Sequence, residues 1–175
     1  MKTELPLIEV DPEIMSGAPV IRGTRVPVEA LFGNLADGLS LDDSSIVFRP
    51  CAAKTRWRFS LRRERRRPLR LLEVLFDECV PRGLRGLLPG HVIKTTPEMG
   101  WWQVGNSALL ARAELAFDAF LTSDKNLGYQ QNLVERRIAI VVLPTNIWRL
   151  IRSNASTVAA ALDRVQPGEF RVLSF

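Results

Sequence analysis

The sequence predicts an α/β protein, in which a three-layer domain with a mainly parallel β-sheet follows a smaller N-terminal module. After residue 70, short apolar segments alternate with segments of helical spacing, which is the pattern of βαβ units. Residues 138–143 form an unbroken apolar run, as expected for a strand buried on both faces of a parallel sheet. A dense arginine cluster in residues 49–70 separates these two parts.

The overall composition excludes several classes of protein. With 175 residues, 46% hydrophobic and 25% charged, the chain has one ordinary domain or two small ones, and is not wholly disordered. No apolar run approaches the roughly 20 residues of a membrane span. The N-terminus lacks a signal-peptide core, so we expect a cytoplasmic protein that contacts no membrane. Two cysteines and one histidine argue against a disulfide framework, a zinc site or a histidine-based triad.

The net charge of +5 comes from one segment. Residues 49–70 hold ten basic side chains and one acidic one, whereas the rest of the chain is mildly acidic. We therefore divide the chain into an N-terminal module (1–45), an arginine-rich linker (46–69) and a C-terminal domain (70–175).

The N-terminal module is expected to contain short strands and a helix. Apolar residues favour strands near residues 8–10 and 20–21. The spacing over residues 28–36 predicts a helix, and Gly38 is suited to its C-terminal cap. A second helix starting at Ser40 would complete a helix-turn-helix outline, although most such pairs are plain helical hairpins.

A longer motif adds to this interpretation. The string DPEIMSGAPVIRGTRVPVEALFGNLADGLSLDD, within about residues 7–43, resembles a family of small bacterial winged-helix proteins (domain of unknown function four-three-three), generally regarded as antitoxins. The resemblance implies repressor-like contact with promoter DNA, for which Arg22 and Arg25 are the candidates, and binding to a partner toxin. The family continues into further helices, whereas this pattern stops at Asp43, which makes the module a truncated fragment.

Three interpretations of the linker remain open. It is a solvated spacer, or a nucleic-acid-binding arm in which Trp57 and Phe59 stack on bases between arginines. The third is that it is a frame-shifted remnant, because codons for residues 51–61 read two bases out of phase can encode an amphipathic helix. We favour this last hypothesis, which makes the chain a fusion of an antitoxin–toxin gene pair.

The C-terminal domain is expected to alternate strands with helices in chain order. Strands are predicted at 71–76, 91–95, 119–122, 138–143 and 170–173, and helices at 81–88, 106–116, 127–136 and 147–162.

Carboxylates follow two of these strands. Asp77 and Glu78 end the first strand, and Asp124 follows the third. Ligands of open parallel sheets bind beyond the carboxyl ends of the strands, so we expect Asp77 and Asp124 to approach each other. Clustered carboxylates need a counter-ion, and Mg²⁺ or Mn²⁺ is the natural one. The alternative is that both aspartates merely cap the helices that follow them.

The strings LFDECVPRGLRGLLPGHVIKT and FDAFLTSDKNLGYQQNL resemble the PIN-like toxin family (domain of unknown function five-six-one-five), over nearly all of residues 70–175. PIN-type proteins are Mg²⁺-dependent ribonucleases, often the toxins of toxin–antitoxin pairs. The resemblance implies that Asp77 and Asp124 are the catalytic, metal-holding acids, with Glu78 as a further ligand. The candidates for contact with substrate are Lys125, by analogy with other phosphate-handling lysines, and Asn126, Asn106, Tyr129 and Gln130. The alternative for Tyr129 and Gln130 is that they are ordinary polar residues of the surface.

One departure from that pattern leaves two functions open. Full PIN nucleases carry another acid early in the helix before the third strand, where this chain has the neutral Asn106. The first function, which the resemblance implies, is a metal-dependent ribonuclease fused to an antitoxin-like fragment. The alternative is a catalytically inactive PIN-like module that acts in complex formation or transcriptional autoregulation. We expect a homo- or hetero-oligomer, with a cognate toxin or antitoxin chain. If the side chains of Asp77 and Asp124 face away from each other, or if an arginine or lysine already fills the gap between them, the catalytic proposal is overturned.

Overall fold

The computed structural model describes residues 7–39, 71–102, 104–130 and 136–175, and it contains a five-stranded sheet and a two-stranded one. The larger sheet is parallel throughout, with the order β4-β3-β5-β6-β7. Its strands are β3 (Glu73–Phe76), β4 (Val92–Thr95), β5 (Ala119–Thr122), β6 (Ala139–Val142) and β7 (Phe170–Val172). The described helices of this domain are the 3-10 helix η2 (Arg82–Leu87), α3 (Asn106–Ala113), α4 (Leu127–Gln130), α5 (Trp148–Ser153) and α6 (Ala155–Arg164).

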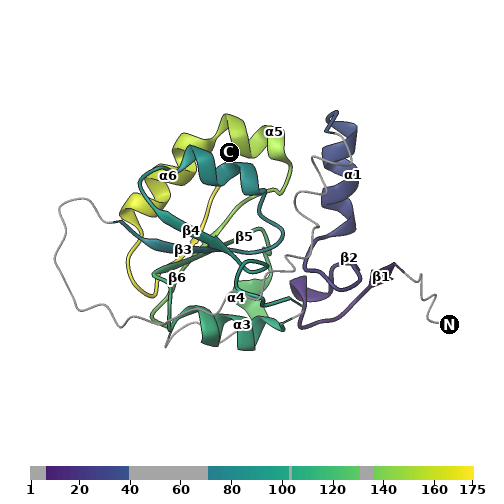
Figure 1. The fold of residues 1–175 in the computed structure, drawn as a ribbon, viewed down its shortest axis with the longest axis horizontal. Helices are drawn as coiled ribbons and strands as arrows, with labels where there is room; N and C mark the ends of the chain where they lie inside the picture. Colours follow the sequence, from purple (N-terminus) through teal and green to yellow (C-terminus); the bar gives the residue numbers. More distant parts are fainter. Residues whose placement is uncertain (1–6, 40–70, 103, 131–135) are drawn as a thin grey trace.

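Helices cover both faces of the large sheet, which confirms the predicted α/β class (Figure 1). Side chains alternate along β3: Val74 and Phe76 pack in one cluster with η2, α5 and α6, whereas Leu75 packs in another with α3 and α4. The run at 138–143 is buried throughout, as expected for a strand covered on both faces.

The strand order places a crevice beyond β3 and β5. From β3 the chain forms β4 on one side, and then crosses to β5 on the other side of β3. In open parallel sheets, ligands bind at such a switch point, outside the carboxyl ends of the strands. The residues that follow β3 and β5 are therefore the ones to examine for function.

The N-terminal segment, defined here as residues 7–39, contains β1 (Ile8–Glu9), the 3-10 helix η1 (Met15–Gly17), β2 (Val20–Ile21) and α1 (Val28–Ala36). Helix α1 has the predicted bounds, and Gly38 ends it with a positive φ of 86°. The segment is not packed by itself, because Ile14, Met15 and Val20 belong to the same apolar cluster as β3. The helix predicted from Ser40 and the arginine-rich linker lie outside the described residues.

Some helices differ from the sequence prediction. The helix expected at 147–162 is divided at Asn154 (φ −113°), whose side chain donates a hydrogen bond to the carbonyl of Leu150. The segment after Pro81 is a 3-10 helix, consistent with the poor helix propensity of its two glycines. Of the helix expected at 127–136, the described part is α4. Within the described ranges, no helix has the length and apolar character needed to cross a membrane.

Candidate functional site

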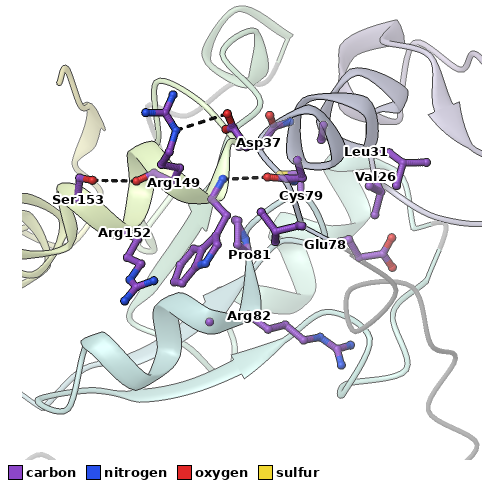
Figure 2. A pocket seen from close by; sticks show the side chains of 16 residues that line it. Val26, Leu31, Asp37, Glu78, Cys79, Pro81, Arg82, Arg149, Arg152 and Ser153 are labelled. Atoms are coloured by element: carbon purple, nitrogen blue, oxygen red, sulfur yellow. Dashed lines mark hydrogen bonds and ion pairs between the residues drawn. The ribbon is translucent and has the colours of Figure 1, made fainter. Parts of the chain in front are cut away.

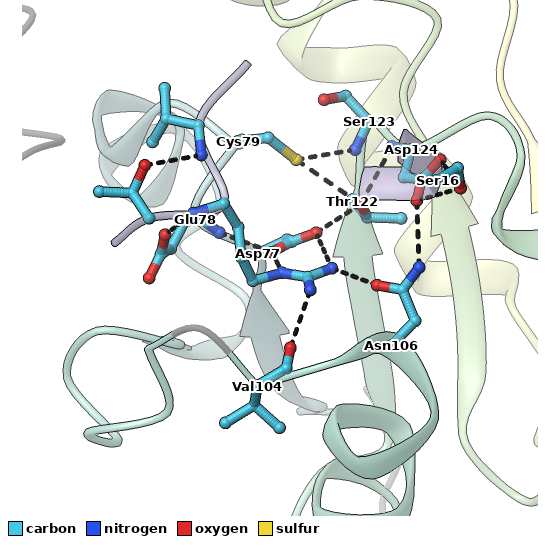
Figure 3. A network of polar contacts seen from close by, with 12 residues as sticks. Ser16, Asp77, Glu78, Cys79, Val104, Asn106, Thr122, Ser123 and Asp124 are labelled. Carbon is cyan, nitrogen blue, oxygen red and sulfur yellow. Dashed lines mark hydrogen bonds and ion pairs between the residues drawn. The ribbon is translucent and has the colours of Figure 1, made fainter. Parts of the chain in front are cut away.

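The candidate site lies where β3 and β5 end. Asp77 follows β3 directly, Asp124 comes two residues after β5, and Asn106 is the first residue of α3. All three side chains are buried, with exposed fractions of 1%, 4% and 0%. The structure thus brings the two predicted aspartates and the predicted asparagine to one rim of the sheet (Figure 3).

Thr122, the last residue of β5, links the two aspartates. Its hydroxyl donates to Asp77 Oδ2 at 2.8 Å and accepts the backbone N–H of Asp124 at 3.1 Å. Asn106 Nδ2 reaches Asp124 Oδ2 at 3.4 Å. The parallel register fixes this arrangement, because it aligns Phe76, the last residue of β3, with Leu121, which directly precedes Thr122.

The positive charge that balances these carboxylates is Arg25, from the N-terminal segment. Its Nε lies 2.8 Å from Asp77 Oδ1 and its Nη2 lies 3.4 Å from Oδ2. Nη2 also donates to Asn106 Oδ1 at 2.6 Å, and Nη1 donates to the carbonyl of Val104 at 2.9 Å. The arginine is 0% exposed, so its guanidinium is enclosed by acceptors on several sides.

Burial and charge act in opposite directions on Arg25. Desolvation alone lowers the pKa of Arg25, but the charge of Asp77 and the hydrogen bond that it accepts outweigh this effect, and the pKa is raised. The guanidinium therefore stays charged. Removing one partner of such a buried pair leaves an uncompensated charge in a low-dielectric environment.

Asp124 contacts the N-terminal segment through a neutral group. Ser16 Oγ lies 2.8 and 2.7 Å from the two carboxylate oxygens, and it donates its single proton to them. Met15 and Ser16 adopt the left-handed region, with φ of 47° and 56°, ahead of Gly17 at 81°. That backbone is costly for residues with a side chain, so contacts with the α/β domain must stabilise it.

Glu78 accepts the backbone N–H of Arg25 through Oε2, while its buried Oε1 has no hydrogen-bond partner among the described residues. Burial raises its pKa to about 7, and the charge of Asp77 adds to this effect, against the opposing hydrogen bond from Arg25. Glu78 therefore holds the backbone of the inserted segment rather than facing Asp124.

The neighbouring Cys79 packs as a structural residue. Its buried Sγ lies 3.6 Å from Thr122 Oγ1 and accepts the backbone N–H of Ser123 at 3.3 Å. Burial raises the pKa of this thiol, and the charge of Asp77 raises it further, so the thiol stays neutral.

The other predicted residues fall around this cluster. Lys125 and Asn126 are exposed beside it, and the backbone N–H of Asn126 donates to Asp124 Oδ1 at 3.0 Å. Tyr129 and Gln130 lie in α4, but their side chains are outside the described residues.

The two arginines predicted to contact DNA differ sharply. Arg22 is exposed and available, whereas Arg25 is enclosed in the acidic cluster, where it cannot reach DNA in this arrangement. The sequence pattern required a cation at Asp77 but did not identify Arg25 as that cation. In the described conformation Arg25 is the arginine that, by the condition stated above from the sequence, counts against catalysis.

A metal ion bound by Asp77 and Asp124 would occupy the position that the Arg25 guanidinium fills. Two carboxylates and the amide oxygen of Asn106 are hard oxygen donors of the kind that Mg²⁺ and Mn²⁺ prefer. Within the described ranges, however, no group of three or more His, Cys, Asp or Glu side chains is arranged to hold a metal. In the described conformation the guanidinium already neutralises Asp77, so an ion can bind the pair only after Arg25 has left.

Comparison with known proteins bears on the N-terminal segment. A family model described as a protein of unknown function (DUF433) matches residues 8–44, as its resemblance predicted. No curated protein and no solved structure matches the chain. The resemblance of residues 70–175 to PIN-like toxins remains a prediction.

Proposed function

We propose that this chain is a toxin–antitoxin related protein, in which a PIN-like, metal-dependent ribonuclease domain is closed by an antitoxin-like N-terminal segment. The observation that carries the proposal is the meeting of Asp77 and Asp124, through Thr122, at the carboxyl ends of adjacent parallel strands. Arg25 on Asp77 argues against catalysis in the described conformation, so the proposal applies to a conformation from which the arginine has withdrawn. A cationic side chain from one part of the chain thereby stands where the acids of the other part require a cation.

Several features of the rim support a nuclease. Asp77 and Asp124 are buried, aligned by Thr122, and lie at the switch point where α/β sheets bind ligands. With Arg25 withdrawn, Asp77, Asp124 and the Asn106 amide oxygen are the residues that would hold Mg²⁺ or Mn²⁺. Such an ion, when bound, activates water and stabilises charge on a phosphoryl group.

The chain's own residues have definable parts in this scheme. Thr122 orients Asp77 by donating to Oδ2, so one carboxylate oxygen is already fixed when the guanidinium leaves. Ser16 must release Asp124 at the same time, because both contacts come from the N-terminal segment. Lys125 is exposed and follows Asp124 in the chain, and in this proposal it contacts a phosphate of the RNA strand.

The alternative is a non-enzymatic binding module, acting in complex formation or transcriptional autoregulation. The presence of Asn106, rather than a third acid, favours this alternative, because a neutral amide binds a divalent ion less tightly than a carboxylate. The buried Arg25–Asp77 pair then has a structural role alone.

RNA cleavage by the full chain separates the two functions. Arg25→Met removes the cation while keeping an apolar side chain of similar length, and we expect Mg²⁺-dependent RNA cleavage that exceeds that of the wild type. The matched control is Arg25→Met combined with Asp77→Asn, which neutralises both partners and should fold but cleave nothing. Melting curves of all variants establish folding. A folded Arg25→Met protein that cleaves no RNA with Mg²⁺ or Mn²⁺ contradicts the ribonuclease proposal and favours the binding module.

A further inference from the structure

A pocket of about 790 Å³ separates helix α1 from the α/β domain, and it starts next to the acidic cluster. Glu78 and Cys79, which directly follow Asp77, line one end (Figure 2). Val26, Ala30 and Leu31 belong to the wall contributed by the N-terminal segment. The volume is in the range of ligand sites, and the lining joins apolar with charged groups.

The α/β wall of this pocket carries more basic than acidic side chains. The α/β domain contributes Arg82, Arg149 and Arg152, with Glu78 at the end next to the acidic cluster, whereas the N-terminal segment contributes Asp37. In Figure 2, Arg149 points toward Asp37 and Arg152 points to another side of the pocket. Side chains that diverge in this way do not converge on one small anion, but they suit successive phosphates of a strand.

Helix α1 presents oxygen acceptors to this basic wall. Asp37 Oδ1 lies 3.4 Å from Arg149 Nε, and Asn34 Oδ1 accepts the backbone N–H of Trp148 at 3.0 Å. The Arg149 side chain is 68% exposed, so its pair with Asp37 is weak and easily exchanged. The N-terminal segment therefore contacts the α/β domain through two pairs of opposite charge: Arg25 with Asp77, and Asp37 with Arg149.

An aromatic side chain also belongs to the wall. The indole of Trp148 packs over Gly83, where an added Cβ would lie 2.9 Å from the ring. Trp148 is partly buried and also packs against the apolar cluster of the α/β domain, so its ring shapes the wall and the charge of the path comes from the arginines.

We propose that the α/β domain binds single-stranded RNA along Arg82, Arg149 and Arg152, and that helix α1, which forms the opposite wall of the pocket, restricts this path in the closed chain. The inference rests on the proposed function, in that it supplies the substrate strand that leads to the acidic cluster. RNA and the N-terminal segment then compete at two places: at the acids through Arg25, and at the arginines through Asp37.

Binding to a fluorescein-labelled single-stranded oligoribonucleotide of about six nucleotides, without divalent metal, tests the path separately from cleavage. In the Arg25→Met background, Arg149→Ala with Arg152→Ala should weaken binding about tenfold and reduce the slope of log affinity against log salt by about 1.4. The matched control is Arg164→Ala, an exposed arginine on α6 that does not line the pocket, for which we expect a change within about twofold. In every variant and in the reference protein the arginines of the linker are replaced by serine, so that oligoribonucleotide bound by the linker cannot hide the effect of the path.

A second readout follows α1 itself. Saturating oligoribonucleotide should increase amide hydrogen exchange in residues 28–36 of the wild-type chain, because the strand displaces the helix. Equal affinities for the Arg149/Arg152 double variant and the Arg164 control, or no change in exchange at α1, overturn the inference even if RNA is cleaved. Loss of binding in the double variant together with increased exchange supports the path, even if no variant cleaves RNA and the ribonuclease proposal fails.

Discussion

The two aspartates at the rim are both covered by the N-terminal segment, but by groups of different kinds. Asp77 meets the charged, fully buried Arg25, whereas Asp124 meets the neutral hydroxyl of Ser16 on a left-handed turn. Removing one member of a buried ion pair costs about 3–5 kcal/mol of free energy, whereas the loss of a hydroxyl contact costs about 1 kcal/mol. In the proposed function, Arg25 is therefore the contact that controls whether the site is closed, and Ser16 follows it.

The largest expected effect comes from Arg25→Ala, because it leaves the Asp77 carboxylate buried without its cation. We expect a loss of about 3–5 kcal/mol in the free energy of unfolding. Urea denaturation of the variant and the wild type measures this. Combining Arg25→Ala with Asp77→Asn should recover part of the loss, and an equal loss in both variants would show that Asp77 does not depend on Arg25.

The next effect concerns Glu78 and pH. Its pKa is raised from 4.5 to about 7 by burial, so the folded chain disfavours the ionised form. The folded state then binds more protons than the unfolded state between these values, and stability falls as pH rises from about 4.5 to 7. Unfolding free energies of the wild type and Glu78→Gln across this window should differ in slope. Parallel curves would contradict the raised pKa.

A smaller effect is expected for Ser16→Ala. It removes one hydrogen bond to Asp124, so we expect a loss of about 1 kcal/mol in unfolding free energy, well below that of Arg25→Ala. Ser16→Gly keeps the left-handed backbone without strain and serves as the comparison. If Ser16→Ala destabilises the chain as much as Arg25→Ala, the contrast between the two aspartates is wrong.

The smallest effect is expected at the exposed pair between Asp37 and Arg149. Because Arg149 is largely in solvent, Asp37→Ala should change the unfolding free energy by less than about 0.5 kcal/mol. Thermal melting at low and at high salt measures it, and a large, salt-dependent decrease would show that the pair anchors α1.

Local patterns were sufficient to predict much of the fold. The apolar run at 138–143 predicted a strand buried on both faces, and the spacing before Gly38 predicted α1. The rule that strand ends carry ligand sites predicted that Asp77 and Asp124 would share one rim. These features depend on periodicity and topology, which a single sequence contains.

The partners of these aspartates could not be predicted in the same way. Repulsion between carboxylates required a cation, but nothing local distinguished a metal from an arginine 52 positions earlier in the chain. The left-handed backbone of Met15 and Ser16 had no sequence signal either, because it is stabilised by contacts with the α/β domain. Both unpredicted features lie where the N-terminal segment contacts the α/β domain, and there the conformation depends on tertiary contacts rather than on local sequence.

The most direct test of the central claim is Mn²⁺ binding, followed by electron paramagnetic resonance on the full-length wild type, on Arg25→Met and on Arg25→Met with Asp77→Asn. If Arg25 and a divalent cation compete for Asp77 and Asp124, Arg25→Met should bind one ion that the wild type binds weakly and the double variant does not bind. Equal Mn²⁺ binding by all three proteins, or none by a folded Arg25→Met, would contradict the account.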